Sequence, residues 1–384
     1  MKRIYLDYNS TTPLSGRVRN SLVAALDTFG NPSSIHSEGR AAKTVMQKAR
    51  HALAELIHSD PGKIVFTSGA TEAAMTLLTP HYFMGRSPLF MSHLYFSATE
   101  HPCITSKGRF PAGMSTVIPV DGDGIVQPDV LRTILAGHNK SKGLPLVAIQ
   151  YANHETGVIQ PIEVLAPIVK EVGGFFIVDS VQVLAKEKLD ITRKCGDFFI
   201  FSAHKIGGPK GIGAFACVDS FVMPQPLITG GGQEKGFRAG TESLPLIAAF
   251  GAAAIDAQDH LQRQDHLAKL QKNLEDGLKK IQPSTIIHGS RTRRLVNTTF
   301  FSTPGFKAEN MQIAFDLEGV AVSAGAACSS GKVGTNPILQ AMGIFDSNGA
   351  IRISVGWETN ADDIKDFLTI FQNIVSRKNN QQHA

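Results

Sequence analysis

Short apolar runs alternate with helical stretches between about residue 60 and residue 220, and this alternation limits the fold more than any other feature of the sequence. Several runs are apolar throughout, as in strands that helices cover on both faces. Strands joined by helical crossovers run parallel. We therefore predict an α/β fold whose large domain has a mainly parallel, seven-stranded sheet flanked by helices. The expected strands are Ile64–Thr67, Leu94–Ser97, Val117–Val120, Leu146–Gln150, Phe175–Val178, Phe198–Ser202 and Gly213–Cys217.

The pattern changes after Gly240, where the sequence predicts a smaller α+β domain. A helical stretch from Leu244 to about Lys280 has few helix breakers and should carry the chain out of the first domain. We place the large domain at 16–258 and the small domain at 1–15 and 259–384. The elements expected in the small domain are strands at Leu295–Phe301, Val320–Ser323 and Ile351–Val355, a helix at Glu309–Leu317, and a last helix that begins with a capping box of Thr359 and Asp362.

The composition argues against several classes of protein. The net charge is +5 and no Lys/Arg block is interleaved with aromatic residues, so direct nucleic-acid binding is not expected. The longest apolar stretch, Leu244–Ile255, is too short to span a bilayer, so a membrane partner is not expected either. Four cysteines lie far apart, which argues against a zinc site or a disulfide framework. We expect a cytoplasmic protein, because the first residues become polar before an apolar signal region could form.

Two polar residues come at the ends of predicted strands. Lys205 follows an apolar strand and precedes a glycine-rich loop, which suits a lysine that forms a Schiff base; the alternative is a surface lysine at the start of a loop. Asp179 also ends a strand, where ligand groups collect in α/β sheets. A carboxylate there can keep a pyridine nitrogen protonated, and Gln182 would lie on the same turn. The alternative for Asp179 is a helix N-cap.

Two further segments have the composition of ligand-binding loops. Thr67–Glu72 joins a strand to a helix, and its small residues would let backbone N–H groups approach a phosphate. Many turns of this kind bind nothing. Gly230–Glu234, followed by Arg238–Glu242, is a second glycine-rich loop, and its alternative is a flexible linker.

Three single residues are candidates for chemistry. Cys328 lies among small polar residues and glycines in Ser323–Gly331, a setting that favours a mobile loop and a reactive thiol over a buried, inert one. His101 follows a strand and could stack on a flat ring, although a lone histidine is more often structural. Arg352 interrupts an apolar strand, so its guanidinium requires a carboxylate from the protein or from a substrate.

Taken in order along nearly the whole chain, these segments resemble the cysteine desulfurases, which belong to the class V aminotransferase group of fold-type I pyridoxal-phosphate enzymes. The short Cys-Ser-Ser-Gly loop is similar to the type that supplies sulfur for iron–sulfur clusters. The matching segments are 5–12, 30–36, 100–102, 152–161, 202–205 with 208–211, the loop at Gly230 and the loop at Cys328.

The resemblance implies a role for each candidate. Lys205 would carry pyridoxal phosphate, His101 would stack on its ring and take part in catalysis, and Asp179 would pair with the pyridine nitrogen. Arg352 would bind the substrate carboxylate, together with Asn153 on the substrate side. The implied cofactor site consists of Ala70, Thr71, His101, Asn153, Asp179, Gln182, Ser202, His204, Lys205 and, from the second subunit of a homodimer, Thr241.

The activity implied by the resemblance is conversion of L-cysteine to L-alanine. Sulfur would pass as a persulfide on Cys328 to an acceptor protein, such as an iron–sulfur scaffold or a tRNA-thiolation protein, and Cys328 could also be a transient ligand of an iron–sulfur cluster. The alternatives are another class V enzyme, such as an aminotransferase or a selenocysteine lyase, or a non-catalytic scaffold. A loop cysteine distinguishes the desulfurase from the other class V enzymes, which do not need it.

The chain departs from the family pattern at several positions. Tyr8 stands where the family usually has asparagine, His154 where it has a second asparagine, and Ser180 where it has alanine. Ala70 replaces a frequent glycine, and the loop reads Gly-Ala-Ala-Cys in place of Gly-Ser-Ala-Cys.

Overall fold

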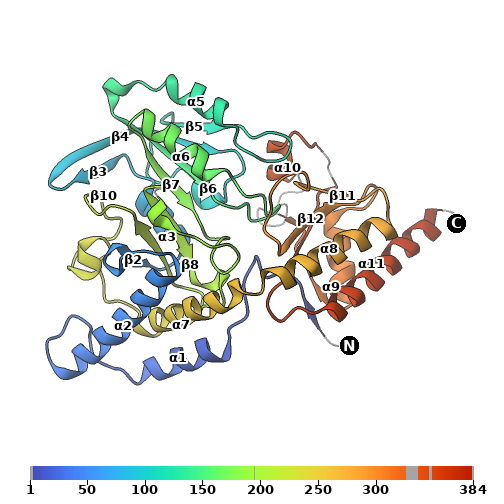
Figure 1. Cartoon of the computed structure of the whole chain (residues 1–384), viewed down its shortest axis with the longest axis horizontal. Helices are drawn as coiled ribbons and strands as arrows, with labels where there is room; N and C mark the ends of the chain where they lie inside the picture. The colour runs from blue at the N-terminus through green and yellow to red at the C-terminus, as the bar shows by residue number, and fades with distance from the viewer. Residues whose placement is uncertain (1–2, 194, 326–335, 346–347, 383–384) are drawn as a thin grey trace.

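The computed structural model describes residues 3–193, 195–325, 336–345 and 348–382 (Figure 1). A large sheet with helices on both sides forms one body, and the C-terminal elements form a smaller body beside it. The strands of the large sheet are β2 (Ile64–Thr67), β3 (His81–Met84), β4 (Ser87–Ser97), β5 (Ser115–Ile118), β6 (Leu144–Gln150), β7 (Phe175–Asp179), β8 (Phe198–Ser202), β9 (Gly213–Cys217) and β10 (Val222–Pro224).

All seven predicted strands are present in this sheet. Their order is β5-β4-β6-β7-β8-β9-β2. The neighbouring pairs from β5 to β8 are parallel, whereas β9 runs antiparallel to both of its neighbours, β8 and β2. Two strands were not predicted: β3 and β10 extend the sheet as an antiparallel edge beside the first half of β4. Most residues of β3 are exposed, so its sequence lacks the apolar run by which the buried strands were recognised.

Helices cover both faces of the large sheet. Successive residues of β8 alternate between two apolar clusters: Phe199 and Phe201 belong to one, and Phe198 and Ile200 to the other. The first cluster includes side chains of α1, α2, α5, α6 and α7, and the second includes side chains of α3 and α4. These helices are α1 (Gly16–Leu26), α2 (Ser37–Leu56), α3 (Ala70–Leu77), α4 (Pro102–Thr105), α5 (Pro128–Ala136), α6 (Ile162–Glu171) and α7 (Leu244–Leu261).

The smaller body has its own apolar cluster, which contains Leu6 from the N-terminus together with Phe301, Phe315 and Phe367. We propose that this separate core marks the small domain expected from the sequence. Its strands are β1 (Ile4–Tyr5), β11 (Ile286–Ile287), β12 (Thr298–Ser302), β13 (Val320–Ala321) and β14 (Ile351–Ser354). Its helices are α8 (Gln264–Ile281), α9 (Ala308–Leu317), α10 (Pro337–Ala341) and α11 (Ala361–Gln382). Short 3₁₀ turns lie at Pro61–Lys63, Lys140–Lys142, Ile191–Arg193, Ala203–Lys205 and Gln233–Gly236.

Two sequence predictions differ from the structure in detail. The helix expected from Leu244 to about Lys280 is interrupted at residues 262–263, because α7 packs with the large core and α8 with the small one. The capping box of α11 lies one residue later than expected. Asn360 and Asp363 form it, and the hydroxyl of Thr359 instead accepts a hydrogen bond from the N–H of Gly356.

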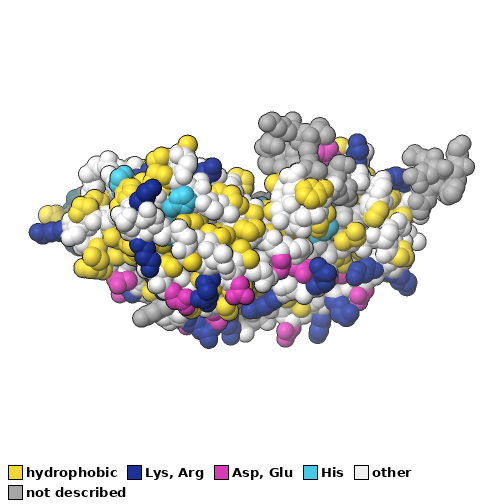
Figure 2. All heavy atoms as spheres, turned by 90° about the horizontal axis from the view of Figure 1, so that it is seen from above, with side chains coloured by type: hydrophobic (Ala, Val, Ile, Leu, Met, Phe, Trp, Pro, Cys, Tyr) yellow, Lys and Arg dark blue, Asp and Glu magenta, His cyan; other side chains and the backbone are white. Residues whose placement is uncertain are grey.

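The distribution of surface charge and the length of the helices concern the two partners that the sequence did not lead us to expect, nucleic acid and a membrane. On the face shown in Figure 2, Lys and Arg side chains are interspersed with Asp and Glu along one border. Among the described residues, none of the helices is long and apolar enough to cross a membrane.

A buried ion pair fixes the loop after β10 to the large domain. Arg50 on α2 pairs with Glu234, and each residue is only 7% exposed. Glu234 also accepts a hydrogen bond of 2.8 Å from the N–H of Phe66 on β2. Both partners are removed from water, so loss of one leaves an unpaired buried charge.

We expect Glu234→Ala to lower the free energy of unfolding by about 3–5 kcal/mol, because the charge of Arg50 stays buried without a carboxylate to pair with. The matched control is Glu171→Ala, which breaks the exposed pair with Arg132 and should cost less than about 1 kcal/mol. Urea unfolding of both variants measures the difference. Equal losses in the two variants would contradict the structural role assigned to Glu234.

Candidate active site

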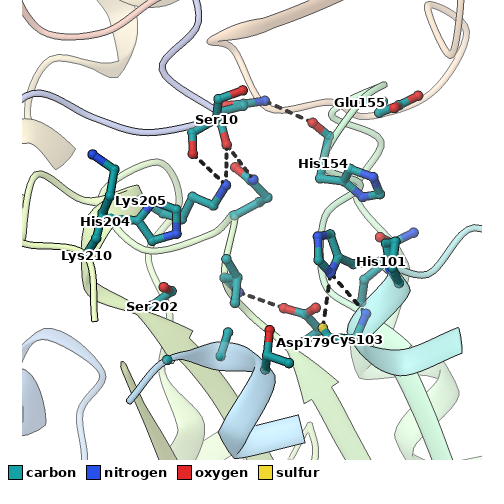
Figure 3. A pocket seen from close by; sticks show the side chains of 18 of the residues that line it. Ser10, His101, Cys103, His154, Glu155, Asp179, Ser202, His204, Lys205 and Lys210 are labelled. Carbon is teal, nitrogen blue, oxygen red and sulfur yellow. Dashed lines mark hydrogen bonds between the residues drawn. The ribbon is translucent and has the colours of Figure 1, made fainter. Parts of the chain in front are cut away.

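A cavity of about 750 Å³ lies at the carboxyl ends of β7 and β8 (Figure 3). Both bodies of the protein contribute to its wall, since Asn9, Ser323 and Arg352 lie opposite residues of the large sheet. Of the residues predicted from the sequence, the structure brings nine together here: Ala70, Thr71, His101, Asp179, Gln182, Ser202, His204, Lys205 and Arg352.

Lys205 ends the 3₁₀ turn that follows β8, so the end of the strand points its side chain into the cavity. Its Nζ donates hydrogen bonds to the carbonyl oxygens of Asn9 at 2.7 Å and Ser10 at 2.9 Å. Burial lowers the pKa of Lys205 to about 8, and the positive charge of Arg352 adds to this effect. An amine with such a pKa is partly neutral at physiological pH and can act as a nucleophile or a base.

Asp179 is the last residue of β7 and is 7% exposed. Its Oδ1 accepts a hydrogen bond of 3.0 Å from the N–H of Val181, so the carboxylate caps the turn that follows the strand. Burial raises the pKa of Asp179 to about 6, against the opposing effect of that hydrogen bond and of Lys205. Asp179 is therefore mainly ionised at neutral pH and can pair with a protonated ring nitrogen.

His101 caps α4 from the other side of the cavity. Its Nδ1 lies 3.2 Å from the N–H of Cys103 and 3.1 Å from the sulfur of that residue, so Nδ1 is the hydrogen-bond acceptor of the ring. The ring is open to the cavity, yet desolvation by the surrounding protein lowers its pKa to about 4, with Lys205 adding to the effect. His101 thus presents a neutral, flat imidazole to whatever occupies the cavity.

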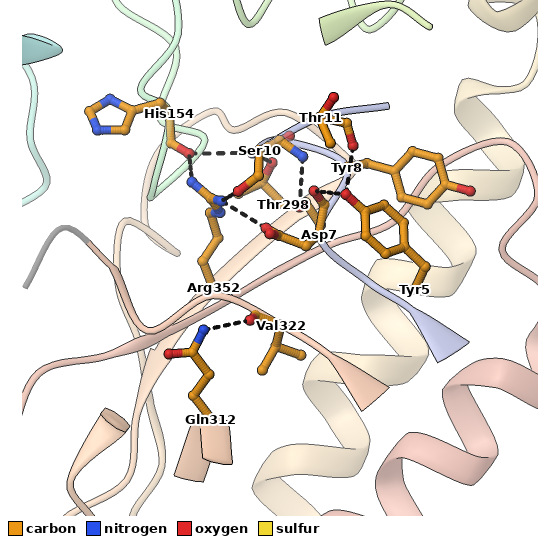
Figure 4. Close-up of polar contacts among 12 residues, drawn as sticks. Tyr5, Asp7, Tyr8, Ser10, Thr11, His154, Thr298, Gln312, Val322 and Arg352 are labelled. Carbon is orange, nitrogen blue, oxygen red and sulfur yellow. Dashed lines mark hydrogen bonds and ion pairs between the residues drawn. The ribbon is translucent and has the colours of Figure 1, made fainter. Parts of the chain in front are cut away.

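Arg352 lies on β14 of the small sheet and is 6% exposed. Figure 4 shows its guanidinium bonded to three groups: the Oδ1 of Asp7 at 2.8 Å, the Oγ of Ser10 at 2.7 Å and the carbonyl oxygen of His154 at 3.0 Å. Its Nε is buried without a hydrogen-bond partner among the described residues. The carboxylate that the sequence left open is therefore Asp7, and two of the five N–H groups of Arg352, on Nε and Nη1, are not used in these bonds.

One end of the cavity is suited to an anion. Ala70 and Thr71 form the first turn of α3, whose backbone N–H groups have no intrahelical acceptor, and both line the cavity. Ser202, the last residue of β8, and His204, on the turn that follows, also line the cavity. These groups can hold a phosphate.

Two predicted site residues do not line this cavity, and a third lies outside the part of the chain that the structure describes. Asn153 is buried, and its side chain joins two loops: it donates to the carbonyl of Thr99 at 3.0 Å and accepts from the N–H of Glu155 at 2.9 Å. Thr241 is exposed and lies away from the cavity of its own chain. Cys328 lies outside the described residues.

Sequence reasoning assigned no role to several residues that shape the site. Asn9 and Ser10 accept the hydrogen bonds of Lys205, and Lys186 donates to the Oε1 of Gln182 at 2.6 Å. A polar turn directly after a short apolar strand was the available signal for residues 9 and 10. In the described ranges no group of three or more His, Cys, Asp or Glu side chains could hold a metal ion.

Comparison with known proteins identifies the family and the fold. The sequence model of the Aminotransferase class-V family matches residues 4–367. The chain is 34% identical to the cysteine desulfurase IscS of Dictyoglomus turgidum, over 98% of this chain and 96% of that protein. The structure of a NifS-like protein from Rickettsia africae matches with a TM-score of 0.87 at 33% identity, over 98% of this chain and all of the other. The structure of SspA in complex with cysteine matches at 26% identity with a TM-score of 0.74, over 92% of this chain and 99% of the other.

The low pKa of Lys205 predicts how the stripped protein reacts with pyridoxal phosphate. Only the neutral amine attacks an aldehyde, so labelling of Lys205 should rise with pH and reach half its maximum near pH 8. Arg352→Gln removes a nearby positive charge and should move this midpoint to higher pH. Borohydride trapping followed by mass spectrometry measures the labelled fraction.

Lys210→Gln is the matched control, because Lys210 also lines the cavity but does not contribute to the shift of Lys205. Its midpoint should equal that of the wild type. A wild-type midpoint close to 10.5, the ordinary value for lysine, would show that the amine is not buried as described.

Proposed function

Because the chain belongs to the cysteine desulfurases of the class-V aminotransferase family, we propose that it removes sulfur from L-cysteine and releases L-alanine. The observation that carries this proposal is the convergence of Lys205, Asp179, His101 and Arg352 on one cavity. Cysteine bound to the structurally similar SspA supports the substrate.

The residues of the cavity fit pyridoxal phosphate, the cofactor of this family. Lys205 provides a partly neutral amine for its aldehyde, Asp179 a buried carboxylate for the ring nitrogen, and the first turn of α3 an anion site for its phosphate. His101 faces the cavity as a neutral ring that can cover the cofactor. When bound, pyridoxal phosphate supplies an electron sink for the pair of electrons left at the substrate Cα.

The residues of the chain bind the substrate, remove its proton and keep the ring nitrogen charged. Arg352 binds the substrate carboxylate through its free Nε and in competition with Asp7. Lys205, which is held near the same end of the cavity, takes the proton from Cα. Asp179, ionised at neutral pH, keeps the ring nitrogen positive.

We assign the sulfur to Cys328. In this step the carbon–sulfur bond of the substrate breaks and sulfur bonds to the Cys328 thiolate as a persulfide, while the carbon skeleton gains protons and leaves as alanine. Among the described cysteines, Cys103, Cys195 and Cys217 are all buried. A thiol in a glycine-rich loop favours a desulfurase over an aminotransferase or a selenocysteine lyase. The four residues that converge on the cavity argue against a non-catalytic scaffold.

We further propose where the sulfur goes and where in the cell the protein acts. The persulfide passes to an acceptor protein, for iron–sulfur cluster assembly or tRNA thiolation, and Cys328 contacts a nascent cluster transiently as a ligand. A cytoplasmic location is supported by the reduced thiol that this chemistry requires.

We also propose that the protein is a homodimer. The segment from the end of α1 to the start of α2 exposes three large apolar side chains, Leu26 at 62%, Phe29 at 85% and Ile35 at 90%, and a group of such side chains is typical of an interaction surface. Thr241 is exposed and remote from its own cavity, which suits a residue that completes the phosphate site of the other subunit.

Cys328→Ser should lower sulfide release from L-cysteine by more than about 1,000-fold, because the acceptor of the sulfur is removed. The visible absorption of the lysine-bound cofactor should remain, since Lys205 and Asp179 are unchanged. Cys195→Ala is the control, and it should keep its rate within about twofold because the residue is a small buried side chain outside the cavity. Normal sulfide release by Cys328→Ser would place the nucleophile elsewhere.

The double variant Phe29→Asp/Ile35→Asp should sediment as a monomer and lose pyridoxal phosphate more readily than the wild type, because Thr241 of the partner subunit no longer contributes. Leu317→Asp is the control, since Leu317 is 82% exposed on α9 and should leave the dimer intact. A double variant that remains dimeric would refute this interface.

A further inference from the structure

The imidazole of His154 forms part of the cavity wall and has no role in the chemistry proposed above. It meets the ring of His101 edge-on, with ring centroids 5.2 Å apart. Its Nδ1 is buried and has no hydrogen-bond partner among the described residues. Since a buried polar atom is costly without a partner, the His154 side chain has hydrogen-bonding capacity that the described residues do not use.

Ser10 determines how an amino acid would lie against this wall. Its carbonyl accepts from Lys205 at 2.9 Å, and its hydroxyl accepts from Arg352 at 2.7 Å. The amine that takes the proton from Cα and the guanidinium that binds the substrate carboxylate therefore meet at Ser10. The side chain on Cα must point elsewhere, and Figure 3 shows His101 and His154 across the cavity from Lys205.

The charge of the two imidazoles limits which side chain fits against them. Burial lowers the pKa of His154 well below its ordinary value, and the pKa of His101 is about 4, so both rings are neutral at physiological pH. A neutral imidazole has one nitrogen that accepts a hydrogen bond. This wall therefore suits an uncharged side chain with a proton to donate, as a thiol has, and it offers no cation to a carboxylate side chain.

We propose that His154 is a specificity-determining residue whose imidazole accepts a hydrogen bond from the thiol of bound cysteine. The proposal rests on the proposed function and adds the contact that distinguishes the substrate from its product, alanine. His154 also stands where the family pattern has asparagine, a smaller side chain that can accept the same hydrogen bond but cannot pack edge-on against His101.

The test uses holoenzyme with Cys328→Ser, in which bound cysteine keeps its sulfur, and compares His154→Phe, His154→Asn and His154 unchanged. Dissociation constants for L-cysteine, L-alanine and S-methyl-L-cysteine come from the change in the visible spectrum of the cofactor. In His154→Phe we expect L-cysteine to bind about tenfold more weakly, as for one lost hydrogen bond. L-alanine and S-methyl-L-cysteine, which have no thiol hydrogen, should change by less than about twofold, and His154→Asn should recover most of the loss.

The outcomes separate this inference from the function on which it rests. If L-cysteine and L-alanine weaken equally in His154→Phe, or if L-cysteine does not weaken, the role assigned to His154 is wrong while the desulfurase remains. If neither amino acid alters the spectrum when His154 is unchanged, and the protein with Cys328 intact releases no sulfide, the proposed function itself is wrong.

Discussion

The hydrogen bonds from Lys205 to the carbonyl oxygens of Asn9 and Ser10 hold the site together. They join the N-terminus of the chain to a lysine 196 residues after Asn9. The N-terminal segment is fixed in turn by the small sheet, because β1 pairs with β13 and Asp7 bridges to Ser354. A buried amine is costly without acceptors, so the lysine is stable in this position only while the two bodies of the protein stay joined.

Asn9 extends this constraint to the cofactor side of the cavity. Its carbonyl also accepts from the amide of Gln182 at 3.1 Å, and its side-chain oxygen accepts from Lys186 at 2.8 Å. Lys186 is 8% exposed, and burial lowers its pKa well below the ordinary value for lysine, with Lys205 and Arg352 adding to the effect. The hydrogen bonds of Lys186 go to the uncharged side-chain oxygens of Asn9 and Gln182. Lys186 therefore orients Gln182 without a further carboxylate near Lys205.

The buried strands of the large sheet could be predicted because each is an apolar run whose two faces both meet helices. The runs of β6, β7 and β8 carry this signal in full. β3 could not be predicted, since its pattern is that of an exposed edge. The break between α7 and α8 was also missed, because a helix that changes from one core to another has no glycine or proline at the turn.

The contacts within the site could also be predicted only in part from the sequence. Lys205 and Asp179 follow from the rule that ligand groups collect at the ends of strands, but contacts across the two bodies leave no local pattern. Arg352 illustrates this: its burial in a strand required a carboxylate, and only the fold identifies it as Asp7, 345 residues away in the chain. Asp7 thus compensates the guanidinium, and a substrate carboxylate that bonds to Arg352 competes with Asp7 for it. The N-terminal segment does not depend on this ion pair alone, because β1 pairs with β13 and Asp7 bridges to Ser354. The carbonyls of Asn9 and Ser10 can therefore stay beside Lys205 while substrate is bound.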